Sequence, residues 1–453
     1  MTLNFTRFFG LDPEALAKLA AGVPGAHTDV FLEFSQAGLV RMEHGALVAA
    51  TLDRAQGAAL RSLSPQGGTR LATDTDVRLL TLRHLARDFG ARPLGEEALR
   101  VENFGGPPER TPDLSRLITL AELADRVART ADRAVVEVQV SLRDGIRHTV
   151  LATQARQVID AWAERASFAV EVVTERGRLR ETAFESAGGA DVMLDEELVE
   201  ETTRLAVARA LALLEARPAT GGPMPVVLAA EAGGTLVHEA VGHALEADCV
   251  LEGLSCFGDR MGELIANPRI SVVDDATLPG RHGSYPIDDE GVPAERTMLI
   301  DRGRLVGFLH DRRSALLSGA RSTGKGRRES FRDRPVVRMS NTMILPGADD
   351  PAAILRDTER GLYVVRMGGG EVDTLTGSFV FEANEAYRIE GGRRGELVRG
   401  ATLTGSAAEV LANIDRVGSD LGFGLGWCGK DGQDVPISDA EPTLRIPSLV
   451  VGA

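Results

Sequence analysis

Two histidines and a glutamate lie close together in an otherwise apolar segment, residues 234–246. Glu239 directly follows His238, and His243 comes five positions after His238. Zinc sites that activate water commonly take two ligands from one helix and a third from elsewhere, with a nearby carboxylate to accept the water proton. A carboxylate buried in an apolar helix is costly without a positive partner, which a zinc ion would supply. The segment therefore predicts a metal site with Glu239 as its base, and the alternative is a pair of ordinary core histidines.

The spacing of this motif, HExxxH, does not suit a straight α-helix. Five residues turn about 500°, so the two imidazoles would diverge by roughly 140°. Gly242, immediately before His243, would let the helix end, widen into a π-type turn or kink. We therefore expect an irregular backbone that brings His243 back toward His238.

A third ligand is expected from a distant glycine-rich turn, and Cys428 lies in such a segment, residues 422–433. The other two cysteines, Cys249 and Cys256, have six residues between them. This separation matches no zinc-binding pair, so we interpret them as small buried apolar side chains. So few cysteines in a chain of 453 residues favour a reducing compartment over a disulfide-built extracellular protein.

The chain resembles the TldD/PmbA family, on its TldD side, through a set of motifs that follow the family's order. These segments are residues 236–243, 273–275, 287–291, 326–330, 339–342 and 428–433, with a weaker similarity at residues 57–63. The resemblance implies a zinc metallopeptidase that acts on peptides and unfolded chains. It also implies that His238, His243 and Cys428 bind one zinc per chain and that Glu239 is the catalytic glutamate.

The resemblance implies a dimer as well, because TldD subunits typically pair with a non-catalytic PmbA (TldE) subunit. That partner lacks HExxxH, whereas this chain keeps it, so the catalytic subunit is the better assignment. Whether the chain forms a homodimer or a heterodimer with a PmbA/TldE-like subunit stays open. Two other functions also remain: a regulatory zinc protein that binds a partner chain without cutting it, and a zinc amidase of small modified peptides.

Several residues beyond the metal motif are candidates for substrate binding. Arg327 and Arg328 belong to a basic segment with three possible roles. It is a solvated loop, it binds substrate carbonyls or a carboxylate, or it forms ion pairs with the acidic turn at residues 288–290. The glycine run Gly368, Gly369 and Gly370 is either a flexible turn or a path along which an extended peptide lies. His282 and Tyr285 are candidates to polarise a scissile carbonyl.

The overall composition agrees with a soluble enzyme. The formal net charge is −15 and the pI about 5.2, which opposes direct nucleic-acid binding because that needs a basic surface. No run of about 18 apolar residues and no apolar signal core near the N-terminus are present, so we expect a cytoplasmic protein without a membrane segment.

The residue pattern predicts an α+β protein with two domains. Residues 1–217 are expected to form a mixed N-terminal domain, with helices at 12–22, 74–88, 119–130 and 195–216. Its strands are expected within 27–63, with turns near 37–38 and 44–45, and at 135–142, 149–155, 167–174 and 178–185, with hairpin turns at 143–145 and 175–177. A turn-rich segment, residues 218–225, separates it from a β-rich C-terminal domain, residues 226–453, which carries the metal helix.

Overall fold

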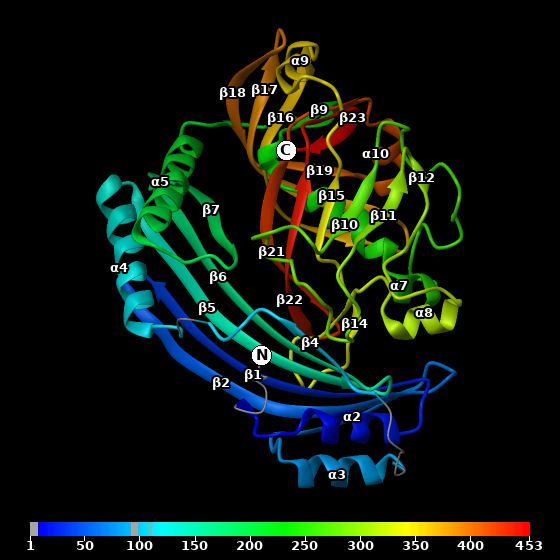
Figure 1. Cartoon of the computed structure of the whole chain (residues 1–453). Helices are drawn as coiled ribbons and strands as arrows, with labels where there is room; N and C mark the ends of the chain where they lie inside the picture. The colour runs from blue at the N-terminus through cyan, green and yellow to red at the C-terminus, as the bar shows by residue number, and fades with distance from the viewer. Residues whose placement is uncertain (1–7, 92–97, 109–110) are drawn as a thin grey trace.

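The computed structural model describes residues 8–91, 98–108 and 111–453. Its first half is built on a seven-stranded sheet with the order β3-β2-β1-β5-β6-β4, in which β7 also pairs with β6. The strands are β1 (His27–Glu43), β2 (Ala46–Leu63), β3 (Thr69–Asp74), β4 (Arg100–Phe104), β5 (Val135–Thr153), β6 (Gln157–Arg176) and β7 (Leu179–Ala190). Figure 1 shows these long strands as a curved sheet below and beside the second half of the chain.

The strands of this sheet are longer than the sequence pattern predicts. The predicted turns at residues 37–38 and 143–145 are wrong, because both segments lie inside continuous strands, β1 and β5. Gly145 pairs with Ala37 on one side and with Arg165 on the other. The turn predicted at residues 44–45 is confirmed, whereas the turn predicted at 175–177 lies at residues 177–178, because Glu175 and Arg176 still belong to β6. Gly45 and Gly177 take φ values of +76° and +67°, which glycine adopts readily.

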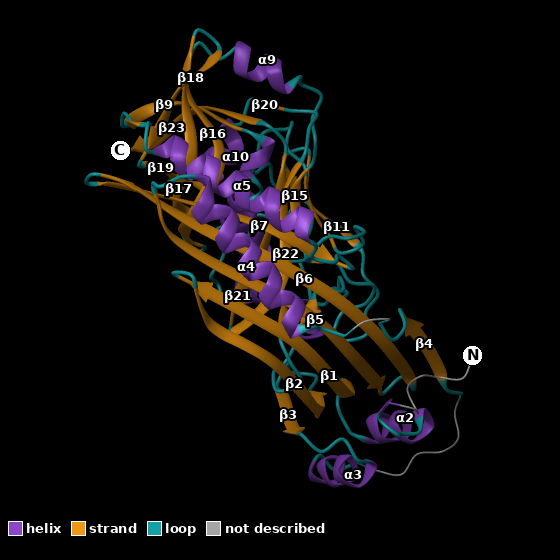
Figure 2. Cartoon of the chain, turned by 90° about the vertical axis from the view of Figure 1, so that its left-hand side faces the viewer, coloured by secondary structure: helices purple, strands orange, loops and turns teal. Residues whose placement is uncertain are grey.

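Four helices of the described residues cover this sheet: α2 (Pro13–Gly22), α3 (Leu79–Asp88), α4 (Leu114–Ala131) and α5 (Glu196–Leu213). Three of them begin at an aspartate whose side chain accepts backbone N–H groups of the first turn: Asp12, Asp113 and Asp195. Figure 2 shows α4 and α5 lying across the strands on one face. Their apolar faces pack with β5 and β6 in one hydrophobic core, and α2 and α3 pack in another.

The second half of the chain contains two larger sheets and one short β-pair. An eight-stranded sheet contains β8 (Arg217–Pro218), β9 (Gly222–Leu228), β16 (Arg360–Asp373), β17 (Ser378–Glu390), β18 (Arg393–Arg399), β19 (Ala401–Ser406), β20 (Arg416–Val417) and β23 (Leu444–Gly452). A six-stranded sheet contains β10 (Val272–Asp275), β11 (Arg296–Asp301), β12 (Arg304–Leu305), β15 (Asn341–Ile344), β21 (Gly422–Lys430) and β22 (Gln433–Glu441). The β-pair is β13 (Gly326–Arg327) with β14 (Val336–Val337).

Helices are short in this half, so it is rich in strands as expected. They are α6 (Thr235–Val237), α7 (Ala247–Leu251), α8 (Arg312–Ser318), α9 (Pro351–Arg356) and α10 (Ala407–Asn413). The largest hydrophobic core of the described residues belongs to this half and packs the segment after β9 against the strands of both sheets. The mixed α/β fold is therefore confirmed, and the domain boundary between residues 217 and 226 stays a prediction.

Buried aromatic and charged side chains join the two halves. The Phe331 ring lies against Gly57 of β2, where a β-carbon would overlap the ring. Arg61 of β2 donates from Nε to Asp29 over 2.7 Å and forms an ion pair with Glu290 of the acidic turn. Since Arg61 and Glu290 are nearly inaccessible to water, this contact fixes the second half against the first sheet.

Among the described residues, no helix is long and apolar enough to cross a membrane.

Candidate metal centre

The histidine motif lies in a segment with three helical geometries in succession. The α-helical turn α6 passes into a π-helical turn, His238–Gly242, and then a 3-10 turn, His243–Leu245. The backbone N–H of His243 donates to the carbonyl of His238, which is the hydrogen bond of a π turn. Residues five apart lie one turn apart in such a segment, so the two imidazoles share a face, with ring centroids 5.1 Å apart.

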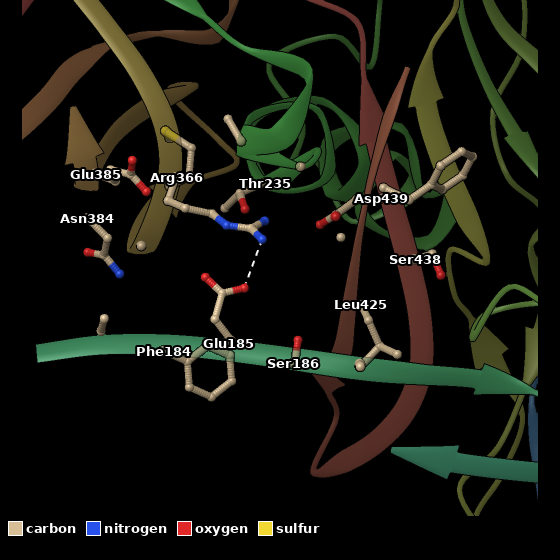
Figure 3. Close-up of a pocket in the computed structure, with 18 of the residues that line it drawn as sticks. Phe184, Glu185, Ser186, Thr235, Arg366, Asn384, Glu385, Leu425, Ser438 and Asp439 are labelled. Atoms are coloured by element: carbon tan, nitrogen blue, oxygen red, sulfur yellow. Dashed lines mark hydrogen bonds and ion pairs between the residues drawn. The ribbon is translucent and has the colours of Figure 1, made fainter. Parts of the chain in front are cut away.

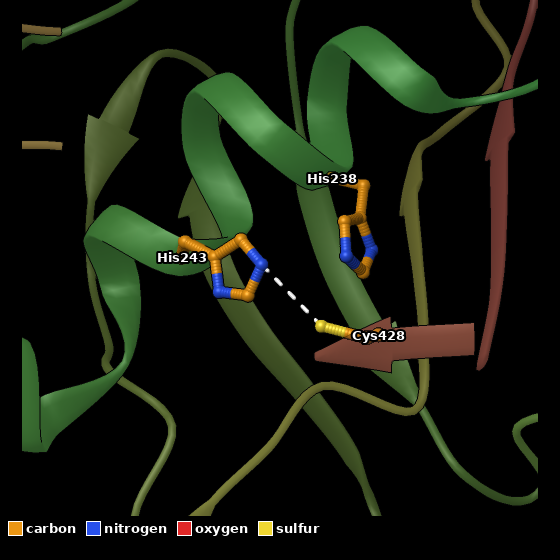
Figure 4. A group of neighbouring side chains, drawn as sticks. All are labelled: His238, His243 and Cys428. Atoms are coloured by element: carbon orange, nitrogen blue, oxygen red, sulfur yellow. Dashed lines mark hydrogen bonds between the residues drawn. The ribbon is translucent and has the colours of Figure 1, made fainter. Parts of the chain in front are cut away.

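Cys428 completes this cluster from the other end of the chain. It lies on β21, opposite Val435 of β22, and its side chain is buried. Its Sγ atom is 3.4 Å from His243 Nε2. One ligand atom from each of His238, His243 and Cys428 lies within 4.8 Å of the others, and Figure 4 shows the three side chains converging.

The side chains of this cluster shift one another's pKa values. Burial alone would raise the pKa of the Cys428 thiol, but hydrogen bonds and positive charge from the two histidines lower it to about 5. Burial opposes charge on His243, yet the neighbouring Glu246 carboxylate and Cys428 raise its pKa well above the ordinary value. A thiolate is the form that binds a metal ion, so the two histidines favour the form of Cys428 that a metal needs.

Glu246 contacts this cluster and Lys430 contacts Glu246, and neither residue was predicted from the sequence. Glu246 Oε2 is 3.0 Å from His243 Nδ1 and accepts a hydrogen bond of 3.0 Å from Lys430 Nζ. The only sequence signals were the position of Glu246 three residues after His243 and of Lys430 two residues after Cys428.

Glu239 lies within the π turn and is half-buried. Burial is the main reason that the pKa of the Asp439 carboxyl group on β22 is raised. The charge of the nearby Glu239 adds to this increase. Asp439 also accepts a hydrogen bond of 3.2 Å from the Gly234 N–H at the start of the metal segment. Glu239 therefore lies in the neighbourhood of a second carboxylate, and that carboxylate faces a cavity.

This cavity has a volume of about 530 Å³ and lies between the two halves of the chain. Its walls come from β7, β16, the start of the metal segment, and β21 with β22. Figure 3 shows Arg366 and Glu185 pointing toward one another from β16 and β7, joined by an ion pair of 2.8 Å. Thr235 and Asp439 are on the wall nearest the metal segment.

The structure brings some of the candidate substrate residues to this cavity and leaves others elsewhere. Gly368, Gly369 and His282 line it. Gly370 packs against Phe381, and the Tyr285 hydroxyl donates to the Gly324 carbonyl over 2.9 Å.

Arg327 and Arg328 are both buried. Arg327 donates to the carbonyls of Met339 and Pro436 over 2.7 and 2.8 Å. Arg328 donates to the backbone carbonyl of Asp289 over 3.2 Å. This is a contact with the acidic turn, which was one of the three alternatives for this basic segment. In this structure both guanidinium groups therefore bind the protein's own interior.

Residues 221–453 match a family model described as the PmbA/TldA metallopeptidase C-terminal domain. The chain is 40% identical over 345 residues to the metalloprotease TldD homolog of Haemophilus influenzae, covering 74% of this chain and 71% of that protein. It is 31% identical over 441 residues to the metalloprotease MJ0996 of Methanocaldococcus jannaschii, covering 94% and 97%. A zinc metalloprotease TldD homolog of Saccharolobus solfataricus is 34% identical over 233 residues, covering 51% and 52%.

The fold is also similar to solved structures. TldE from Thermococcus kodakarensis superposes with a TM-score of 0.72 over 99% of both chains, at 18% sequence identity. A Thermotoga maritima protein described as a proposed modulator of a DNA gyrase superposes with a TM-score of 0.75 over 94% of this chain and 96% of that chain, at 20% sequence identity.

Proposed function

Because the chain belongs to the PmbA/TldD metallopeptidase family, we propose that it is a zinc-dependent peptidase that cleaves peptides and unfolded polypeptides. The observation that carries this proposal is the convergence of His238, His243 and Cys428 within 4.8 Å, with Glu239 in the same turn. The name of the Saccharolobus relative supports zinc as the metal.

The donor set fits zinc. Two imidazoles and one thiolate are ligands that zinc prefers, and three protein ligands leave a coordination position for water or substrate, as in catalytic zinc sites. We propose one zinc per chain, held by His238, His243 and Cys428. When bound, zinc would supply the Lewis acidity that brings the pKa of water toward neutrality.

The protein's own residues carry the proton transfers in this proposal. Glu239 accepts a proton from the attacking water and passes it to the leaving amine. His238 and His243 are held on one face by the π turn, and Cys428 supplies the single negative charge of the ligand set. A thiolate donates more charge than a third imidazole, so the site keeps less positive charge for the developing oxyanion.

The cavity beside the metal segment supports an extended substrate. Gly368 and Gly369 line it without side chains, and residues 184–188 of β7 form the opposite wall. A peptide that adds along such a backbone is held by main-chain hydrogen bonds, with little demand on its sequence. A folded protein cannot present that shape, which is why we propose unfolded chains as substrates.

We propose further that the chain acts as a dimer, with itself or with a TldE-like subunit, in the reducing environment of the cytoplasm. The structural similarity to TldE supports a partner of this kind. All three cysteines are free in the structure, which agrees with a reducing compartment.

The test compares wild-type protein with Glu239→Gln on a permanently unfolded, cysteine-alkylated polypeptide, with zinc measured in both. The amide keeps the shape of Glu239 but removes the base, so cleavage should fall at least about a hundredfold while zinc content persists. Equal cleavage by the variant would exclude Glu239 as the base. Zinc binding without any cleavage by the wild type would favour a regulatory zinc protein, and cleavage of short amides alone would favour an amidase.

A further inference from the structure

Glu246 forms a buried link between the segment that carries the two histidines and strand β21, which carries Cys428. Its side chain is inaccessible to water, and its Oε2 atom contacts both His243 Nδ1 and Lys430 Nζ at 3.0 Å. When His243 Nδ1 carries the proton and donates it to this carboxylate, the ring orientation is set and Nε2 is left as the metal-binding atom. Nε2 is the atom that faces Cys428 Sγ.

Lys430 connects this carboxylate to the strand that carries Cys428. The two residues are two positions apart on β21, so their side chains leave the same face of the strand. The Lys430 ammonium donates to Glu246, to Asp248 over 2.7 Å and to the Val337 carbonyl over 3.1 Å. An ammonium has three N–H donors, so each donor has one acceptor.

The same geometry argues against a second metal site at this place. Glu246, Asp248 and Cys249 also come close enough together to hold an ion. However, Lys430 Nζ lies within 3.0 Å of both carboxylates and already supplies the positive charge that a metal would bring.

A purely stabilising role explains the arrangement poorly. Buried ion pairs lose much of their attraction to desolvation, and apolar side chains of similar volume are often at least as stable. What apolar residues cannot do is accept the Nδ1 proton of a histidine and hold the ring in one orientation.

We propose that Glu246 and Lys430 are positioning residues that orient His243 toward Cys428 before the metal arrives and thereby set the metal affinity of the site. This rests on the ligand set of the proposed function. Outer residues of this kind typically change metal affinity by about 10–100-fold.

The experiment measures zinc affinity by chelator competition, and the near-ultraviolet thiolate-to-metal absorption of the cobalt-substituted protein. Lys430→Met and Glu246→Ala should each weaken zinc binding by about 10–100-fold. Because the pair acts as one unit, the double variant should lose little more than the worse single variant. The cobalt-thiolate band should shift or weaken, since Cys428 no longer faces a fixed imidazole.

Lys325→Met is the matched control. Lys325 is a fully buried lysine paired with Asp274, and its hydrogen bonds go to Ser340 and the Glu295 carbonyl rather than to the metal cluster. Its removal should lower the unfolding midpoint of the metal-free protein but leave zinc affinity and the cobalt spectrum unchanged. Equal losses of affinity in this control and in Lys430→Met would overturn the proposal, because they would reflect stability alone.

Failure of this inference and failure of the proposed function give different results. If His238→Ala abolishes zinc binding while Lys430→Met and Glu246→Ala bind as the wild type does, only the positioning role is wrong. If the wild type binds zinc with the expected dependence on Lys430 but never cleaves peptides, the positioning role stands and the peptidase assignment falls.

Discussion

Gly242 lies against Met339 so closely that a β-carbon on the glycine would overlap the Met339 sulfur atom. Met339 is fully buried, so it has little room to withdraw. The π turn between the two histidines thus packs on a side chain from a distant segment, and the absence of a side chain at Gly242 permits this contact.

Gly242→Ala should destabilise the protein by about 1–3 kcal/mol, the usual cost of overpacking a core. Met339→Ala should cost less in the Gly242→Ala background than in the wild type, because it removes the atom that is overlapped. Denaturant unfolding of the four proteins measures this coupling. Strict additivity of the two changes would show that the contact does not constrain the turn.

Cys428→Ser should weaken zinc binding by more than the roughly 10–100-fold expected for an outer residue, since a hydroxyl is a poor anionic ligand near neutral pH. Zinc stoichiometry and affinity, measured by metal analysis and chelator competition, check this. If both Cys428→Ala and His238→Ala keep one zinc per chain, the proposed ligand set is incorrect.

Gly369→Val tests the proposed peptide path without disturbing the fold. No atom lies within 4 Å of a β-carbon at Gly369, although the residue lines the cavity. We expect kcat/KM for long peptides to fall at least about tenfold with zinc content unchanged, since a misplacement of about 1 Å can cost a hundredfold.

The control for this variant is Gly106→Val, at an exposed glycine that also has open space and does not line the cavity. It should cleave as the wild type does. Equal kinetics in Gly369→Val would place the substrate elsewhere.

His282→Gln should reduce the loss of stability in acid. Burial and the charges of Arg165, Arg327 and Arg143 lower the pKa of His282 to about 3 from an ordinary value of 6.5. Between these values the unfolded chain binds a proton that the folded chain does not, so stability falls as the pH falls, by up to about 1.4 kcal/mol per pH unit.

Urea unfolding between pH 6 and pH 4 should therefore show a shallower pH dependence in His282→Gln than in the wild type. Because only the slope is compared, any loss of packing from the substitution does not affect the result. Identical slopes would mean that His282 is protonated in the folded protein.

The proposal of a dimer that accepts only unfolded substrates predicts the results of two measurements. Light scattering should give the mass of two subunits for the active protein, alone or with a TldE-like subunit. Cleavage of a stable folded protein should be much slower than cleavage of its denatured form. A fully active monomer, or equal digestion of both forms, would count against this proposal.

The sequence predicted the irregular backbone at Gly242 but not which irregularity occurs. Ending, widening and kinking the helix all satisfy the HExxxH spacing locally. The π turn observed packs against Met339, which is far away in the chain and carries no local signal.

Long-range contacts also explain the other differences. Residues 143–145 have turn propensity, but Gly145 is paired on both sides in the middle of a sheet, and such pairing outweighs local preference. Helices that begin at Asp12 and Asp195 were predictable because their capping residues act locally. The contact of Glu246 with Lys430 spans 184 residues and could be recognised only once the fold was known.

The wide separation of the proposed ligands in the chain bears on how the protein is made. His243 and Cys428 are 185 positions apart in the chain, and Cys428 lies on β21. A chain still growing on the ribosome holds both histidines long before the cysteine is added. Tight metal capture, and with it any ability to cut other polypeptides, would therefore begin only after residue 428 has been added.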